Sequence, residues 1–312
     1  MSTSHLKQLR GQVDPVLTQL AIGYKQADFI AERVFPVVQT EKEGVRVPVF
    51  GKGSFVSYAT ERAVGAASNI ITLDSPDYLP VVLEEHDLAA GVDYRDQAES
   101  IYDERAKATR RVTRGVQLRQ EIETAALVTN KATYQSGQTK DLSATKQWSD
   151  PTADVFAEIA DAKELVRAAC GVAPRVLVVG ASVLAALRKN QVLRGALAST
   201  EQKTLLTAEQ IRLLLDLDEL IVGGAVSTPL AKQKTTDVWG KFASLIVRPN
   251  LVDSGNDEGE PSFGYTFRRS GMPLVDRFTD VGGKVEYARY TDIRKAAAVG
   301  STCGFLFEKA IA

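Results

Sequence analysis

The sequence is poor in the residues on which metal, redox and disulfide chemistry depends. Only two cysteines, Cys170 and Cys303, and two histidines, His5 and His86, occur among its 312 residues. Two distant cysteines cannot build a zinc site, and a histidine-based metal centre is just as poorly supplied. Each cysteine adjoins a glycine in a segment predicted to be structured, so we expect buried free thiols rather than a disulfide framework. We predict no metal and no cofactor.

Long apolar runs and a strong charge of one sign are missing as well. No apolar segment is long enough to span a bilayer, and the N-terminal MSTSHLKQLRGQV lacks the apolar core of a signal peptide. We therefore expect a protein made in the cytosol, with no membrane partner. The formal net charge is −1, so nucleic acid could be bound only through a local basic patch.

Catalytic motifs are incomplete. Gly180 and Ser182 stand at a predicted strand-to-helix turn, as in the nucleophile elbow of hydrolases, but Leu184 replaces the second glycine of that motif. A triad would also need His5 or His86 as its base, and both precede the serine. We therefore predict that Ser182 is a helix N-cap and that the chain is not an enzyme, with an α/β hydrolase as the least favoured alternative.

The charged segment EEHD, from Glu84 to Asp87, is the other candidate for chemistry. Its carboxylates and imidazole could act together as a ligand set. The simpler interpretation, which we favour, is a strand end with a solvated charged face.

Periodicity divides the first half of the chain into an arm, a hairpin and a helix. Residues 1–43 give short amphipathic pieces, interrupted by Gly23 and Pro36. Residues 44–58 alternate as in a strand, and the small polar segment 60–70 suits the tip of a long hairpin. The spacing of apolar residues from Tyr94 to Asn130 predicts a helix of about 35 residues, which Gly115 could bend.

The second half predicts a mixed α/β region. Pro151 occupies a plausible first helical position, Gly171 a helix stop, and Thr207 with Gln210 a capping box. RVLVVG and ELIVGGAVS have the composition of buried strands, and two helical segments separate them. The later segments are mostly extended, and we expect the apolar C-terminus to end inside a sheet.

The middle of the long predicted helix, residues 105–119, contains six basic residues and no acidic one. Arg110 and Arg114 are four residues apart and share a face, with Arg111 beside them. One interpretation is sequence-independent contact with phosphates. The other is a solvated face that pairs with acids on a neighbour, and the sequence leaves both open.

The order of these elements resembles that of the major capsid proteins of tailed bacteriophages. YKQADFIAERVFPVVQTEKEGVRVPVFGKGSF is similar to the arm and the start of the extended loop in one branch of that family. Residues 94–130 are similar to its spine helix, and PRVLVVGASVLAALRKN with LLTAEQIRLLLDLDELIVGGAVS to its axial domain. YARYTDIRKAAAVGSTCGFLFEKAI is similar to its closing strands, so the resemblance covers nearly the whole chain.

The resemblance implies an α+β phage major capsid fold in four parts. These are an N-terminal arm (1–43), an extended β-hairpin loop (44–75), a peripheral domain with the spine helix (76–150 and 283–312) and a mixed α/β axial domain (151–282). The implied function is that of a head protein that self-assembles, through pentamers and hexamers, into an icosahedral shell around phage DNA. It would be located in the virion, after assembly in the cytoplasm of the host bacterium.

The partners implied by the resemblance are other copies of the chain and packaged double-stranded DNA, with scaffold, portal and decoration proteins as further candidates. The chain has no long leader, so we expect a separate scaffold or none. An encapsulin-like protein compartment is the main alternative, although the basic run favours a genome as cargo.

In the family, the arm and the extended loop lie over adjacent subunits, so we expect apolar residues of Asp28–Phe55 to be buried between chains. Lys52 lies near the loop tip, but no motif supports a covalent crosslink through it. The spine helix lies on the inner side of the family's shell wall, so Arg110, Arg111 and Arg114 are expected to face DNA. The expected contacts between subunits are Phe29, Ile30, Phe35, Val47, Val49, Phe50, Lys52 and Phe55.

Overall fold

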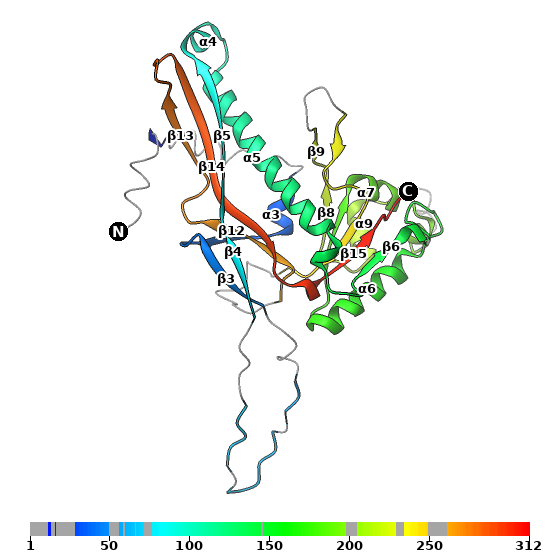
Figure 1. The fold of residues 1–312 in the computed structure, drawn as a ribbon. Coiled ribbons are helices and arrows are strands. Elements are labelled where there is room, and N and C mark those ends of the chain that lie inside the picture. Colours follow the sequence, from blue (N-terminus) through cyan, green and yellow to red (C-terminus); the bar gives the residue numbers. More distant parts are fainter. Residues whose placement is uncertain are drawn as a thin grey trace.

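The structure is a computed structural model. It describes residues 12–13, 16, 29–49, 56–58, 60–65, 67–71, 77–144, 146–197, 205–228, 234–248 and 261–312. These residues form two bodies, each built around a β-sheet, and a hairpin that projects from them (Figure 1). His5 and the predicted contact residues Phe50, Lys52 and Phe55 lie outside the described residues.

The first sheet is organised around the long strand β14 (Val285–Ala298). One edge of β14 pairs antiparallel with β5 (Glu84–Asp93), and the other pairs with β13 (Leu274–Thr279) and β12 (Gly264–Arg269) in succession. At the ends of this sheet, β2 (Val37–Thr40) lies parallel to β12, and β1 (Gln12–Val13) pairs antiparallel with β13.

A long helix, α5 (Glu104–Thr129), packs across β5 and β14 (Figure 1). A separate short helix, α4 (Tyr94–Glu99), precedes it, so the prediction of one continuous helix from 94 to 130 is wrong. The chain breaks between them because the Asp103 carboxylate caps α5, accepting hydrogen bonds from the N–H groups of Arg105 and Ala106. Ile101, which lies inside the predicted helix, is 96% exposed in this break.

Gly115 does not end α5, which continues through it. A Cβ atom at this position would lie 2.7 Å from Cδ2 of Leu88. The glycine therefore allows strand β5 to pack closely against the helix.

The second sheet has the order β6 (Thr139–Asp141), β15 (Gly304–Glu308), β11 (Ala243–Ile246), β7 (Val176–Gly180) and β8 (Glu219–Gly223). Strands β7 and β8 run parallel, and the helices between them supply the crossover connection that a parallel pair needs. The C-terminal strand lies between β6 and β11, which confirms that the apolar C-terminus ends inside a sheet. The flanking helices are α6 (Val155–Cys170), α7 (Ala181–Leu187), α8 (Gln191–Gly195) and α9 (Ala208–Leu214).

Several local predictions are confirmed in this second body. Thr207 and Gln210 form the capping box of α9, and Gly171 ends α6 in the left-handed conformation with φ 81°. However, α6 begins at Val155 rather than at Pro151. The Asp150 carboxylate accepts a hydrogen bond from the N–H of Thr152, which holds Pro151 in a turn before the helix.

The sheets divide the chain differently from the predicted domains. Strands β12 and β13, which the sequence assigned to the axial domain, pair with β14 of the first sheet. Strand β15, assigned to the peripheral domain, belongs to the second sheet. Strand pairing joins segments that are distant in sequence, so sheet membership does not follow position along the chain. The predicted domain boundaries stay a prediction.

Smaller elements accompany the two sheets. A short helix, α3 (Ala31–Val34), precedes β2, and a small two-stranded sheet joins β9 (Val226–Ser227) to β10 (Thr236–Asp237). Within the described ranges, no helix is both long enough and apolar enough to cross a membrane.

Candidate functional site

The projecting hairpin consists of β3 (Gly44–Val49) and β4 (Asp77–Val82), with Val47 opposite Leu79. Val47 and Leu79 are partly buried against an apolar cluster of Val81, Leu83, Phe267 and Ile293 from the same chain. On the other face of β4, Tyr78 and Val82 are 56% and 67% exposed. The hairpin therefore uses one face for its own subunit and keeps apolar side chains in solvent on the other.

The described residues that connect β3 to β4 are all exposed. In Figure 1 this segment extends beyond the hairpin, away from both sheets. Soluble monomers rarely keep so many large apolar side chains in water unless another molecule covers them. The exposed large apolar residues of this segment are Val56, Tyr58, Val64, Ile70 and Ile71.

The part of the arm that the structure describes has a different environment. Ile30 and Phe35, two of the predicted contacts between subunits, are 1% and 0% exposed within the chain's own core. The prediction for these two residues is therefore corrected. The segment folds back as α3 and β2, which brings Phe35 against Phe263, with ring centroids 5.9 Å apart. Phe29 is only partly buried beside this core.

Glu121 of α5 fixes the beginning of α3. Its Oε1 accepts hydrogen bonds from the Ile30 N–H at 2.9 Å and from Trp239 Nε1 at 2.5 Å, and its Oε2 accepts one from the Ala31 N–H at 2.8 Å. The carboxylate thus replaces the missing side-chain cap of α3, because the N-cap residue Ile30 has none to offer. Burial raises the pKa of Glu121, and these three hydrogen bonds oppose that effect.

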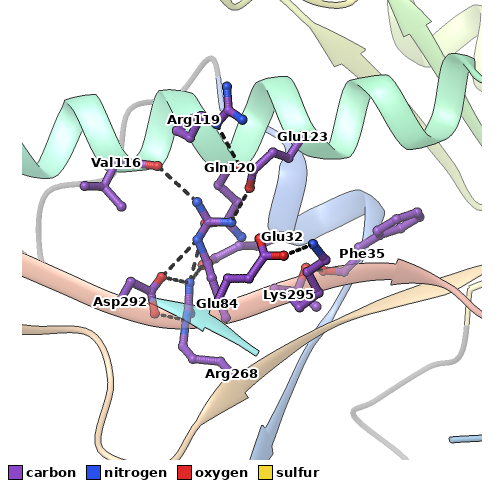
Figure 2. Close-up of polar contacts among 12 residues, drawn as sticks. Glu32, Phe35, Glu84, Val116, Arg119, Gln120, Glu123, Arg268, Asp292 and Lys295 are labelled. Carbon is purple, nitrogen blue, oxygen red and sulfur yellow. Dashed lines mark hydrogen bonds and ion pairs between the residues drawn. The ribbon is translucent and has the colours of Figure 1, made fainter. Parts of the chain in front are cut away.

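A buried ionic network joins the arm, α5 and the first sheet (Figure 2). Arg268 of β12 forms a bidentate pair with Asp292 of β14, with both distances 3.0 Å, and also reaches Glu32 of α3 at 2.9 Å. The fully buried Arg294 of β14 donates to Glu123 of α5 at 2.9 Å. Each buried cation therefore has a carboxylate partner, and removing one partner would leave an uncompensated charge.

A second set of charges joins the arm to the other sheet. Arg33 of α3 pairs with Glu219 of β8 at 2.6 Å, and Arg248 pairs with the same carboxylate. Arg248 also donates to the main-chain oxygen of Arg33 at 2.7 Å. Burial alone would raise the pKa of Glu219, but the two arginines outweigh it and lower the pKa. The described arm is thus held by both bodies of its own chain.

The six basic residues in the middle of α5 divide into two sets. Arg110, Arg111 and Arg114 are exposed, and among the described residues none of them has an acidic partner. Arg110 Nε donates only to the main-chain oxygen of Ala106, one turn earlier, at 3.3 Å. The other three pair with carboxylates of the same chain: Arg105 with Glu286, Lys107 with Glu104, and Arg119 with Glu123.

The candidate catalytic residues are not brought together. Ser182 is the second residue of α7, and Gly180 is its N-cap, so the prediction that Ser182 caps the helix is wrong. A Cβ atom on residue 180 would lie 2.1 Å from the Gly240 main-chain oxygen, and this close approach requires glycine at the cap. His86 belongs to β5 of the other sheet, opposite Asp292.

The EEHD segment forms the start of β5, with Glu84, Glu85 and Asp87 exposed. Glu84 pairs with Lys295. Burial, followed by the charge of Arg294, lowers the pKa of His86. Across the described residues, no group of three or more His, Cys, Asp or Glu side chains could hold a metal ion.

Comparison with known proteins identifies relatives over nearly the whole chain. The family described as "Phage major capsid protein E" matches residues 20–225, more than half of the chain. The "Major capsid protein" of Burkholderia phage BcepMu is 37% identical over 298 residues, which are 94% of this chain and 95% of the relative. The protein of the same name from Pseudomonas phage JBD67 is 28% identical, over 96% of this chain and 97% of that one.

Solved structures give the same architecture. A phage-related protein from Bordetella bronchiseptica RB50 is 27% identical, with a TM-score of 0.76 over 96% of this chain and 98% of its own. The SrpI encapsulin of Synechococcus elongatus PCC 7942 is 13% identical, with a TM-score of 0.52 over 98% of this chain and 94% of its own. At that identity the likeness is one of fold alone.

Proposed function

Because this chain belongs to the phage major capsid protein E family, we propose that its copies assemble through the β3–β4 hairpin into a shell that encloses double-stranded DNA. Its role is that of a phage major capsid protein. Two features of its own structure support the finer proposal: the exposed apolar hairpin, and three arginines of α5 that have no acidic partner among the described residues.

The hairpin supports the assembly part of the proposal. The described residues of its connecting segment are all exposed, and the large apolar side chains among them are exposed too. Covering them with a neighbouring copy would remove apolar surface from water at roughly 25 cal/mol per Å². Val47, Val49 and Phe29 keep part of their surface exposed and stay candidates for the same interface.

The proposal that the shell encloses DNA rests on a difference among the basic residues of α5. Arg105, Lys107 and Arg119 are neutralised by carboxylates of the same chain, whereas Arg110, Arg111 and Arg114 are exposed and lack such partners among the described residues. Phosphates need only positive charge that faces the polymer, so this face suits sequence-independent, salt-sensitive binding. In the proposed shell, this face of α5 is turned toward the packaged DNA.

The test is the triple change of Arg110, Arg111 and Arg114 to Glu. Each residue is exposed, so the subunit should fold, and assembly should proceed. DNA content per particle should fall, because three repulsive charges would meet the phosphates on every copy. Particles are counted by electron microscopy, and DNA is measured after nuclease treatment of the intact particles.

A matched control makes the same change in charge elsewhere. Lys146, Arg188 and Lys189 are exposed residues of the second body, and their change to Glu should leave DNA content unaltered. If the α5 variant fails to assemble, the arginines pair with acids on neighbouring chains instead. Abundant particles with a full DNA content would contradict both accounts.

We infer a structural rather than a catalytic role. Ser182 and His86 lie in different bodies of the fold, and the relatives are named for a shell component. The encapsulin-like alternative is not favoured, since the similarity on which it rests is one of fold alone.

A further inference from the structure

His86 lies partly buried between strand β5 and helix α5, beside the ionic network of Figure 2. It stands opposite Asp292 of β14, and residues directly opposite each other in an antiparallel pair point to the same face. The Asp292 side chain points into the network beneath α5, so the imidazole of His86 does so too. Its Nε2 atom is buried and has no hydrogen-bond partner among the described residues. A buried polar atom without a partner costs stability and needs an explanation.

The charged groups that act on His86 come from its own strand and from both elements packed against it. They are Glu84 on β5, Asp292 and Arg294 on β14, and Glu123 on α5. Their ion-pair partners extend the group to α3 and β12 (Figure 2). This whole group, which we call the charged layer, has four carboxylates, Glu32, Glu84, Glu123 and Asp292, and four cations, Arg119, Arg268, Arg294 and Lys295.

The buried part of the charged layer has no free carboxylate oxygen for a protonated His86. Both oxygens of Asp292 already accept hydrogen bonds from Arg268, at 3.0 Å each. Both oxygens of Glu123 also accept, at 2.7 Å and 2.9 Å, from two other arginines of the layer. Glu84 is exposed and already pairs with a lysine. A proton on His86 would therefore add a fifth cation to a balanced layer, and burying an uncompensated charge is costly.

We propose that His86 is a pH-sensitive contact of α5: its neutral imidazole completes the packing of the helix on β5 and β14, and its protonation in mild acid loosens that packing. The added charge acts first on Arg294 of β14, which is fully buried and pairs with Glu123 of the same helix. Loosening this pair weakens the attachment of α5 to the first sheet. All the groups involved belong to one subunit, so the proposal does not depend on shell assembly.

The direction of the pH effect follows from the surroundings of His86. Burial, followed by the charge of Arg294, lowers the pKa of His86 and outweighs the three nearby carboxylates, which raise it. Folding therefore favours the neutral imidazole. Its contribution to stability is complete above the ordinary histidine pKa of about 6.5 and is lost as pH falls from there through the lower, folded value. Glu123 stays ionised in this window, because its own pKa is lowered.

The test uses the full-length, unassembled chain. Because His5 and His86 are its only histidines, NMR of the imidazole protons gives two signals, and His5→Gln leaves the signal of His86 alone. We expect its titration midpoint below about 6.5. Hydrogen exchange, corrected for the pH dependence of the chemical step, should show that peptides of α5 lose protection between about pH 7.5 and pH 5. The folded-to-unfolded ratio in urea should fall by the factor that separates the acid constants of His86 in the folded and unfolded chains.

His86→Gln removes the titrating group and should abolish the pH-dependent loss of protection in α5. His5→Gln makes the same change at the other histidine and should retain it. Two results would overturn the proposal: a titration midpoint of His86 at or above the ordinary value, or exchange in α5 that rises equally in the wild-type chain and in His86→Gln. If His86→Gln does not fold, the midpoint decides alone, since it is measured with His86 in place.

Discussion

Replacing Glu121 with Gln should destabilise the subunit more than its single-atom change suggests. The glutamine oxygen can still accept from the Ile30 N–H and from Trp239 Nε1, but its amide group would then face the Ala31 N–H, now 2.8 Å from a carboxylate oxygen. One charge-assisted hydrogen bond is lost, and two buried donors then face each other. Each effect lowers the free energy of unfolding by about 1–3 kcal/mol. Removal of a buried charge offsets part of this loss, so we expect about 2–4 kcal/mol.

Urea denaturation followed by tryptophan fluorescence measures this loss directly, because Trp239 is itself one of the partners of Glu121. The control is Glu209→Gln on α9, where the same chemical change breaks an exposed pair with Arg212. An exposed pair contributes about 0–1 kcal/mol. If Glu121→Gln shifts the free energy of unfolding no more than Glu209→Gln does, Glu121 is not the anchor of α3. If Glu121→Gln lowers stability as expected, trypsin should also cleave faster after Arg33, because α3 is held less firmly.

Two further predictions concern pH and assembly. Because the pKa of Glu219 is lowered in the folded chain, its ion pairs stabilise the fold fully above the ordinary glutamate pKa of about 4.3 and are lost as pH falls through the folded value. The stability of the wild-type chain, measured by urea denaturation, should therefore fall more steeply from about pH 5 to pH 3 than that of Glu219→Gln. Parallel curves for the two proteins would contradict this prediction. Deleting residues 51–69 should leave a folded subunit, as judged by circular dichroism, because the described part of this segment is exposed. The same deletion should leave no shells in electron microscopy. Normal shells would show that the segment is dispensable.

The sequence predicts elements best where a single physical signal decides them. Val155, Ile159, Ala162 and Val166 form the buried face of α6, as their spacing indicates. The capping box of α9 and the left-handed Gly171 follow from local chemistry that needs no partner. The strand β7, buried along its whole length, is equally evident from its run of valine and leucine.

Helix α5 shows where this reasoning fails. Half of its buried positions are polar, so the apolar pattern alone cannot outline the buried face. Glu121 is fully buried because it serves the N–H groups of a segment far away in the chain. Arg268, Asp292 and Arg294 are likewise buried charges whose partners come from distant elements. No local pattern distinguishes such residues from a solvated charged face, because tertiary pairing alone makes their burial tolerable.

The sequence suggested that the arm and the hairpin both form contacts between subunits, but their described residues lie in different environments. Ile30 and Phe35 complete the subunit's own core, and carboxylates or arginines from both bodies hold α3 in place. Ordering this segment is therefore part of folding the subunit and does not oppose later association. The hairpin, whose exposed face has no partner among the described residues of its own chain, is left as the apolar surface that a neighbouring copy can cover. Ordering a segment on binding reduces affinity. Because residues 29–40 are already held within the subunit, more of the hairpin's apolar burial is left to stabilise the contact between copies.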